Sequence, residues 1–354
     1  MSCASETKLS KFSEFSDKGL TGLGNCGNSC YINSCIQVLS HTYELNNFLN
    51  KKEYNNKLNK VVDSVILVEW DKLRKLMWSE NCTVAPWGFF RSVQKVADLK
   101  DRDIFTGYAQ NDVQEFLIFL VDCFHNALAR EVDMKIVGNV YNNTDKMAQT
   151  CYKMMKNMYC KEYSEMLGIF YGIHISKITS TKGELLSCTP EPFSIIDLPI
   201  PNTSNPTIYQ CFDLYCKNEL LEKDNAWYND KTKKKETANR SIVFWSLPDI
   251  MIIDFKRWTS VGRYGSRKKQ TAIDTPIENL DMSKYVAGYN NKSYIYDLYG
   301  VCNHLGGVSG GHYTAHVKNA NGQWYAFNDT NVDELDEDKI VTQNAYCLFY
   351  RKKK

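Results

Sequence analysis

The sequence predicts an α+β fold in which helices come first and strands second. Up to about residue 130, apolar side chains recur at the three- and four-residue spacing of amphipathic helices. From residue 168 onward, the chain holds short runs rich in β-branched and aromatic residues, which are typical of strands. With 354 residues, 43% of them hydrophobic, the chain is long enough for one large domain or two ordinary ones. We therefore expect a helical layer and a sheet layer with a cleft between them.

Five helices are predicted in the first part of the chain. They cover residues 31–39, 43–49, 60–78, 86–99 and 110–130. The fourth begins at Pro86, because the first turn of a helix tolerates a residue without an N–H group. The fifth has the clearest apolar face, with Val113, Phe116 and Leu120 at helical spacing. Residues 131–165 are polar and irregular, and either an insertion or a further helix would fit them.

Eight strands are predicted after the helices. They cover residues 168–175, 193–200, 241–245, 250–255, 294–302, 311–318, 323–328 and 345–350. The polar segment 259–274 between two of them is predicted to be a surface loop. Residues 1–17 are also polar, and we expect them to form a flexible N-terminal tail.

A stretch punctuated by glycines, Gly22–Ser34, leads into the first helix. Its glycines permit close approaches that other residues resist, and Asn28 and Ser29 are residue types that begin helices. Cys30 is therefore predicted to lie in the first turn. The exposed N–H groups there are expected to lower the pKa of its thiol and to favour the nucleophilic thiolate.

A second stretch, residues 310–316, supplies a histidine for this cysteine. A cysteine nucleophile needs a histidine base, and the histidine needs an orienting amide or carboxylate. His312 follows two glycines and is the predicted base. Asn328 is the first polar residue after the apolar run of the next strand, and we prefer it as the orienting group. Asp329 directly after it is a candidate to assist or to substitute.

Each of these residues also has a plain structural interpretation. Cys30 is one of thirteen cysteines, and most cysteines are packing residues. His312 would then be a core histidine beside Tyr313, and Asp329 a turn residue. Only the combination of a cysteine at a helix start with a histidine after two glycines favours catalysis.

Charge and cysteine content narrow the class of protein further. The net charge of +2 gives no bias toward nucleic acid, and the short basic runs are interpreted as solvated loops and tail. The sequence contains no run of 18 or more apolar residues, so no membrane span is predicted. Residues 1–8 do not form a secretory signal. Thirteen cysteines without such a signal indicate free thiols in a reducing compartment, cytoplasmic or nuclear.

Five sequence motifs together carry a family resemblance. They are Gly22–Ser34 and residues 109–117, 247–258, 304–329 and 345–350. In this order they resemble the cysteine box, the glutamine–aspartate box, the strand ending in a lysine–arginine–aromatic triplet, the histidine box and the closing strand of the ubiquitin-specific proteases. The matches span residues 19–350, which is nearly the whole chain.

The resemblance implies a papain-like cysteine protease with a helical thumb, a β palm and β-ribbon fingers. Its catalytic domain would cover residues 18–352, with the thumb at about 18–165 and the fingers and palm at about 166–352. The activity implied is hydrolysis of isopeptide bonds at the C-terminal glycine of ubiquitin. Ubiquitin and ubiquitinated proteins are then the expected partners of a monomer that binds neither nucleic acid nor membranes.

The resemblance also assigns roles to further residues. The side chain of Asn25 and the main-chain N–H of Cys30 would form the oxyanion hole. Asp112 and Glu115 would line a narrow channel for the basic tail of ubiquitin, since their spacing of three places them near one helical face. The glycine-rich segment 306–311 would gate that channel.

A structural zinc ion is not expected. Many relatives hold one in the fingers with two C-x-x-C pairs, but no C-x-x-C occurs in this sequence. Cys211 and Cys216 are separated by four residues, Cys188 stands alone, and the segments at the places of the pairs, 177–180 and 229–232, lack thiols. We therefore expect neither zinc nor another cofactor.

Two alternatives to a deubiquitinating protease remain. In the first, the chain is an inactive relative that binds ubiquitin without cleaving it. In the second, it is a protease for a ubiquitin-like modifier. The presence of both Cys30 and His312 favours an active enzyme. A zinc protease is disfavoured, because the sequence contains no H-E-x-x-H motif.

Overall fold

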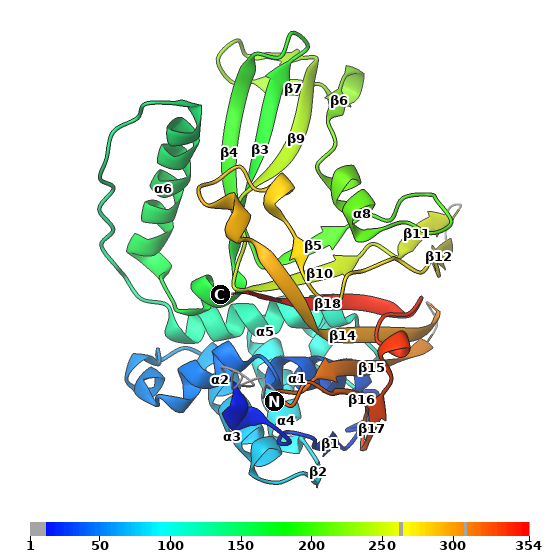
Figure 1. Ribbon diagram of the computed structural model, residues 1–354. Coiled ribbons are helices and arrows are strands. Elements are labelled where there is room, and N and C mark those ends of the chain that lie inside the picture. The colour runs from blue at the N-terminus through cyan, green and yellow to red at the C-terminus, as the bar shows by residue number, and fades with distance from the viewer. Residues whose placement is uncertain (1–11, 262–264, 308–309, 354) are drawn as a thin grey trace, which may run out of the picture.

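A helical layer lies beneath a mixed sheet, and a second sheet of long strands projects away from both (Figure 1). The computed structural model describes residues 12–261, 265–307 and 310–353. The helical layer is the thumb of the molecule. It consists of α1 (Cys30–Ser40), α2 (Tyr43–Asn50), α3 (Asp63–Ser79), α4 (Trp87–Leu99) and α5 (Val113–Leu128).

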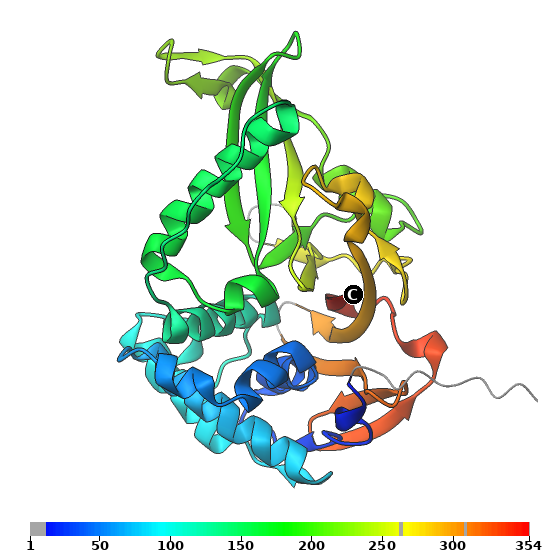
Figure 2. The same ribbon diagram turned by 60° about the vertical axis from the view of Figure 1, so that its left-hand side comes forward.

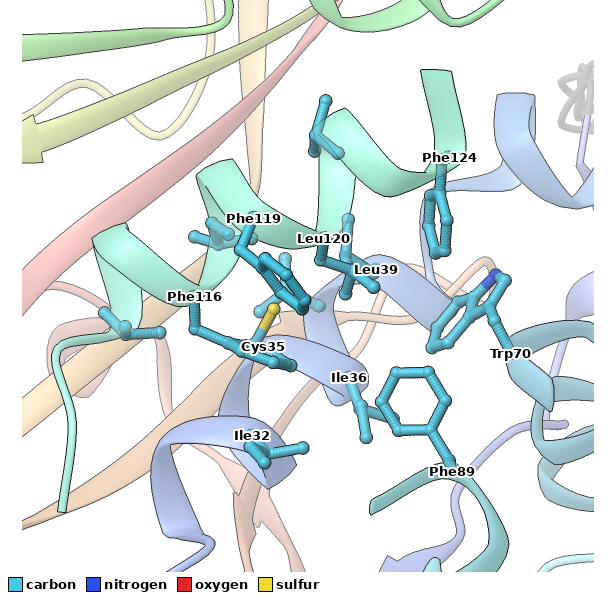
Figure 3. Close-up of a cluster of buried hydrophobic side chains, with 14 of the residues drawn as sticks. Ile32, Cys35, Ile36, Leu39, Trp70, Phe89, Phe116, Phe119, Leu120 and Phe124 are labelled. Carbon is cyan, nitrogen blue, oxygen red and sulfur yellow. The ribbon is translucent and has the colours of Figure 1, made fainter. Parts of the chain in front are cut away.

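The helix α1 forms the centre of the thumb and is buried on every side. Its apolar face packs against the matching face of α5, while α3 and α4 close the cluster from below (Figure 3). The side chains at this junction are Ile32, Cys35, Ile36, Leu39, Trp70, Phe89, Phe116, Phe119, Leu120 and Phe124. Burial of each large apolar side chain contributes roughly 1.5–3 kcal/mol. The N-terminus of α1 is thereby held rigidly against its neighbours.

The palm is a sheet with the strand order β17-β16-β15-β14-β18-β10-β5, and the short β13 pairs with β14. Neighbours in this sheet run antiparallel except for β10 and β5, which are parallel. The strand β10, next to the edge strand β5, is buried along its whole length. The strands are β5 (Ile195–Leu198), β10 (Ile250–Phe255), β13 (Leu280–Asp281), β14 (Ile295–Gly307), β15 (Gly310–Lys318), β16 (Trp324–Asn328), β17 (Asn331–Leu335) and β18 (Ala345–Lys352).

The fingers are a second sheet with the order β4-β3-β9-β6. A two-stranded hairpin, β7 and β8, lies near its far end (Figure 1). These strands are β3 (Gly172–Ser180), β4 (Leu185–Phe193), β6 (Glu219–Leu221), β7 (Trp227–Asn229), β8 (Lys234–Glu236) and β9 (Ala238–Ser246). The helix α8 (Ile208–Tyr215), which was not predicted, lies between the fingers and the palm in the chain.

Residues 131–165, which were left open as an insertion or a helix, contain α6 (Asn143–Glu162). Asn142 and Asp145 form a capping box that begins this helix. Its buried residues Ala148 and Cys151 pack on the fingers beside Trp245. Figure 2 shows α6 running along the finger strands, so it covers the fingers rather than the thumb to which the sequence assigned it.

Two sequence predictions of local structure are wrong. Residues 168–170 belong to a short helix, α7 (Met166–Phe170), and not to the strand that follows it. Met166, Leu167 and Phe170 are all buried at helical spacing, and this periodicity is too short to recognise in the sequence. The polar segment 259–274 is not simply a loop, because β11 (Trp258–Val261) and β12 (Gly265–Lys268) pair as a hairpin around residues outside the described ranges.

The prediction of a flexible N-terminal tail over residues 1–17 is also wrong for residues 12–17. Residues 1–11 lie outside the described ranges, but Phe15 is buried and stacks on Tyr43 with ring centroids 4.7 Å apart. The main-chain N–H of Asp17 donates to Asn319 at 3.1 Å. Aromatic packing thus fixes a segment whose overall polarity suggested disorder. No helix among the described residues has the length and apolarity needed to cross a membrane.

Candidate active site

The stretch before Cys30 begins with a strand that docks between two distant parts of the chain. The strand β1 (Gly22–Leu23) pairs with β2 (Thr83–Val84) on one side. On the other side, the N–H of Leu23 donates to the main-chain oxygen of Asp329 at 2.7 Å. A Cβ on Gly22 would lie 2.2 Å from the oxygen of Thr330, so only glycine permits this approach.

The side chain of Asn25 organises the loop that follows. Its Oδ1 accepts hydrogen bonds from the N–H groups of Gly27 at 3.0 Å and Ser29 at 3.2 Å. Ser29 stands directly before α1, yet its hydroxyl accepts from the N–H of Cys26 instead of capping the helix. The prediction of Ser29 as a helix-start residue is thus right for its position, while its side chain serves the loop.

Cys30 is the first residue of α1 and is buried. Main-chain N–H groups of Tyr313, Tyr31 and Cys30 itself face its sulfur and favour the thiolate. Burial outweighs them, and with a smaller contribution from the charge of Asp329 it raises the pKa of the Cys30 thiol. The sequence predicted a lowered pKa from the helix terminus alone. That prediction is wrong because the packing of the palm against α1 removes the sulfur from water.

His312 lies on β15, the strand that packs against α1. Its Nε2 is 2.6 Å from Oδ1 of Asn328, which ends the neighbouring strand β16. An amide oxygen only accepts, so Nε2 carries the proton and Nδ1 keeps a free lone pair. Within the described ranges no hydrogen bond joins this ring to Cys30. Catalytic hydrogen bonds are often long before substrate binds.

Among the described residues, no hydrogen bond joins Asp329 to His312, although the sequence proposed it as an assisting or substitute residue. It lies in the turn between β16 and β17 with a φ of 49°. Its carboxylate accepts from Nδ2 of Asn25 at 3.0 Å and from Nδ2 of Asn33 at 2.7 Å. Asp329 therefore holds the cysteine loop and α1, while Asn328 orients the histidine.

A hollow between the thumb and the palm adjoins this site and is the candidate channel for the tail. It has a volume of about 290 Å³ and is lined by Gln110, Asn111, Asp112, Trp258, Ser266, His304, Gly307, Gly310, Gly311 and Tyr313. Asp112 caps α5 by accepting from the N–H of Gln114 at 2.7 Å, and it accepts from the hydroxyl of Tyr346 at 2.5 Å. Much of its hydrogen-bonding capacity is therefore used inside the protein.

Glu115, one turn further along α5, is exposed and lines a different hollow. That hollow has a volume of about 190 Å³ and also contains Ile118 and Asp122. The gate predicted at residues 306–311 forms the end of the β14–β15 hairpin, in which Gly307 pairs with Gly310. Residues 308–309 at its tip lie outside the described ranges.

Sequence reasoning missed three residues around the channel. Gln110 donates to and accepts from the main chain of Gly311. His304 is buried on β14 opposite Tyr313. Tyr346 reaches Asp112 from β18. All three lie inside the recognised motifs, so their positions were available, but their partners are set only by the fold.

Comparison with known proteins identifies the family. The family model for the ubiquitin carboxyl-terminal hydrolases matches residues 21–350. The chain belongs to this family. It is 31% identical over 343 residues to human ubiquitin carboxyl-terminal hydrolase 2, covering 95% of this chain and 55% of the human protein. It is 33% identical over 341 residues to Drosophila melanogaster Usp2, covering 95% of this chain and 35% of that protein.

The fold is therefore the α+β, papain-like fold of the ubiquitin carboxyl-terminal hydrolases, as predicted. A solved structure, the Ubp8/Sgf11/Sus1/Sgf73 module of SAGA bound to ubiquitin aldehyde, contains a chain of the same fold. Its TM-score is 0.74 at 23% identity, over 96% of this chain and 71% of that chain. The chain spans about half or less of the length of these curated relatives.

The segments where the resemblance places zinc-binding cysteine pairs lie in the fingers, with residues 177–180 on β3 and residues 229–232 at the turn of the β7–β8 hairpin. The β7–β8 hairpin is closed by Asn229, whose Nδ2 donates to both carboxylate oxygens of Glu236 at 3.1 Å. Its Oδ1 accepts from the N–H groups of Lys231 and Thr232. Among the described residues, no three His, Cys, Asp or Glu side chains are grouped to hold a metal. These residues do not fit a tetrahedral thiolate site.

Proposed function

We propose that this chain is a deubiquitinating cysteine protease, which hydrolyses isopeptide bonds at the C-terminal glycine of ubiquitin. The observation that supports it best is the hydrogen bond of 2.6 Å between Nε2 of His312 and Oδ1 of Asn328, beside a cysteine at a helix start. This bond leaves Nδ1 of His312 as a proton acceptor on the ring. A nucleophile, a base and an orienting amide are the three parts that thiol-dependent amide hydrolysis needs.

In the first half of the reaction, Nδ1 of His312 takes the proton from the Cys30 thiol. The resulting thiolate attacks the carbonyl carbon of the terminal glycine and forms a tetrahedral intermediate. His312 then returns the proton to the lysine amine as the carbon–nitrogen bond breaks. The products of this half are a thioester on Cys30 and a free lysine side chain on the target protein.

Water completes the cycle. Nδ1 of His312 takes a proton from a water molecule, and the hydroxide attacks the thioester carbon. The carbon–sulfur bond breaks, the thiolate regains its proton from His312, and ubiquitin leaves with a free carboxylate. In both halves, negative charge develops on the same carbonyl oxygen. The N–H of Cys30 and the second N–H of the Asn25 amide, whose first is bound to Asp329, are the donors for it.

The channel supports ubiquitin as the modifier. Gly310 and Gly311 line it, and the lack of side chains there leaves room for a bound tail that ends in two glycines. Asp112 in the channel and the exposed Glu115 one turn later suit a basic tail. The solved relative of the same fold was captured with ubiquitin aldehyde. Protein substrates that carry ubiquitin on lysine follow from the same proposal.

Ubiquitin with a C-terminal electrophile tests this function directly. We expect one covalent adduct on the wild-type chain and none on Cys30→Ala, which would establish the nucleophile and the modifier together. An adduct with a ubiquitin-like modifier but not with ubiquitin would retain the mechanism and change the substrate. Binding of ubiquitin without any adduct would indicate an inactive binding protein.

We further infer that the enzyme works as a monomer without a cofactor, in the cytoplasm or the nucleus, and binds neither nucleic acid nor membranes. Twelve free cysteines in the described ranges are compatible with a reducing compartment. The net charge of +2 offers no strong attraction for a polyanion. Light scattering of the purified chain tests the monomer, and a mass near twice 40.8 kDa would contradict it.

A further inference from the structure

Gln110 bridges the cleft to the residue that precedes His312. It lies on the loop before α5, on the thumb, whereas Gly311 lies on β15 of the palm. Nε2 of Gln110 donates to the main-chain oxygen of Gly311 at 2.7 Å. Oε1 of Gln110 accepts from the N–H of Gly311 at 2.9 Å. One side-chain amide thus binds both polar groups of a single residue, 201 positions away in the sequence.

These two groups of Gly311 are free for Gln110 because the sheet does not use them. The neighbour β16 pairs with β15 only from Ala315 to Lys318. The edge of β15 that faces the thumb is therefore open at Gly311. The Gln110 amide takes the place that a further strand would occupy, and it satisfies a donor and an acceptor that would otherwise need water.

The opposite side of Gly311 is fixed by His304. A Cβ at Gly311 would lie 2.2 Å from Nε2 of this histidine, so the glycine rests directly on the ring. Lys268 on β12 donates to Nδ1 of His304 at 3.0 Å and thereby fixes the ring in turn. Burial, together with the charge of Lys268, lowers the pKa of His304 to about 4, so the ring is neutral at physiological pH. Gly311 is held between this imidazole and the Gln110 amide.

We propose that Gln110 is a positioning residue for His312, which fixes the peptide before the histidine from across the cleft. This inference rests on the proposed function. His312 follows Gly311 directly, so a shift of that peptide moves the imidazole relative to Cys30 on the thumb. A misplacement of about 1 Å at reacting groups costs on the order of 100-fold in rate. The two hydrogen bonds between Gln110 and Gly311 form a clamp that joins the thumb to the palm. The clamp thereby fixes the His312 imidazole relative to the Cys30 sulfur.

The alternative role for a polar residue in this channel is contact with the bound tail. Both hydrogen bonds of the Gln110 side chain that the structure contains go to Gly311. A tail contact would appear as weaker binding with an unchanged rate of the chemical step. A positioning role would lower the rate of that step with little effect on binding. Steady-state kinetics separate the two.

The test compares Gln110→Ala, Gln110→Glu and the wild-type chain on ubiquitin with a fluorogenic C-terminal amide. We expect kcat of Gln110→Ala to fall about 10- to 100-fold, while its KM stays within about twofold of the wild-type value. In an inactive Cys30→Ala background, adding Gln110→Ala should change the affinity for ubiquitin by no more than about twofold. Gln114→Ala, on the first turn of α5, is the matched control and should keep the wild-type kcat. An unchanged kcat, or a raised KM with unchanged kcat, would overturn the inference.

Gln110→Glu adds a readout that general loosening of the fold would not produce. Its carboxylate keeps an acceptor for the N–H of Gly311 but repels the carbonyl oxygen. Protonation restores a donor, so the activity relative to wild type should recover as pH falls toward the ordinary carboxyl range near 4.3. A relative activity that does not change with pH would contradict the clamp.

A measurement on the free enzyme keeps this inference separate from the proposed function. Ring ¹⁵N signals of His312 report its environment without any substrate. Gln110→Ala should shift them and leave unchanged those of His41, which is buried at the opposite end of α1 from Cys30. Unshifted His312 signals would overturn the inference whether or not the wild-type chain cleaves ubiquitin. An inert wild-type chain would count against the proposed function alone.

Discussion

Nδ2 of Asn25 donates to Oδ2 of Asp329 at 3.0 Å, across 304 positions of the sequence. The same carboxylate accepts from Asn33 on α1 through its other oxygen. The turn after β16 thus holds both Asn25, the side chain proposed for the oxyanion hole, and the helix that begins at Cys30. Asn328 and Asp329 are adjacent in the chain but serve opposite walls of the site.

Replacement of Asp329 by alanine should damage the oxyanion hole and leave the histidine in place. Asn25 then loses the acceptor that orients its amide, and the loss of one oxyanion donor costs roughly 100- to 1000-fold in kcat. We expect Asp329→Ala to lower kcat by about 10- to 100-fold, because Asn25 itself remains, with KM little changed. Steady-state hydrolysis of ubiquitin with a fluorogenic C-terminal amide measures both constants.

Asp333→Ala is the matched control for this change. Asp333 is an exposed carboxylate on β17, the next strand after the turn, so its removal alters the charge but not the Asn25 contact. A loss of activity of the same size in Asp333→Ala would contradict the assigned role and indicate a general effect of charge.

Asn328→Ala should impair proton transfer. Without Oδ1, Nε2 of His312 loses its acceptor at 2.6 Å, and neither the tautomer nor the ring orientation is fixed. Positioned general acid–base catalysis contributes about 100- to 10,000-fold, so we expect kcat to fall at least about 100-fold. Asn328→Asp keeps an acceptor oxygen and should retain most of the activity. Equal losses in both variants would exclude the orienting role.

The residues of the proposed catalytic group could be located in the sequence because each of them has a local signature. Cys30 follows glycines at a helix start, His312 follows Gly311, and Asn328 ends an apolar strand. The role of Asp329 could not be predicted, since its partners lie at the other end of the chain. The pKa of Cys30 was misjudged for a related reason. The helix terminus is a local feature, whereas the burial that outweighs it comes from the palm.

The fold shows the same division between local and distant causes. The long amphipathic helix α5 was predicted from its own periodicity, and β10 from a short run rich in β-branched and aromatic residues. The short helix α7 was taken for a strand, because five residues do not reveal a period. Phe15 belongs to a polar segment, and its burial depends on Tyr43, which no property of residues 1–17 indicates.

The raised pKa of Cys30 predicts how the free enzyme reacts with iodoacetamide. Only the thiolate is nucleophilic, and burial together with the charge of Asp329 raises the pKa above its ordinary value of 9.0. The rate of Cys30 alkylation should therefore still be rising at pH 9. Asp329→Asn removes the charge, and its profile should move to lower pH. A plateau below pH 7 in the wild-type chain would show a preformed thiolate instead.

Asp112 in the channel and Glu115 in the neighbouring hollow should differ in what they contribute to binding. Glu115 is exposed, and Glu115→Gln should raise KM for ubiquitin substrates by up to about tenfold with kcat unchanged, which corresponds to about 1.4 kcal/mol of binding. Asp112→Asn keeps a residue that caps helices well and isolates the loss of charge. Asp112→Ala should in addition lower the melting temperature, because the helix cap and the Tyr346 contact are lost. Loss of an N-cap typically lowers the free energy of unfolding by about 1 kcal/mol.

High salt provides a check on the same charges. Screening weakens interactions between exposed charges, so KM of the wild-type chain should rise with ionic strength more steeply than KM of the Glu115→Gln, Asp112→Asn double variant. If KM of the two proteins depended on salt identically, the basic tail would not interact with the carboxylates of Asp112 and Glu115.

The finger hairpin predicts that metal removal has no effect. Asn229 and Glu236 close the turn by hydrogen bonds, where a zinc site would need four convergent ligands. Treatment with a strong chelator should leave the melting temperature and the ubiquitin hydrolysis unchanged, and metal analysis of the purified chain should find less than one zinc per molecule. Asn229→Ala should instead speed amide hydrogen exchange in residues 227–236, because the N–H groups of Lys231 and Thr232 lose their acceptor. A chelator-induced loss of stability would show that a metal holds this chain by residues other than those of the hairpin.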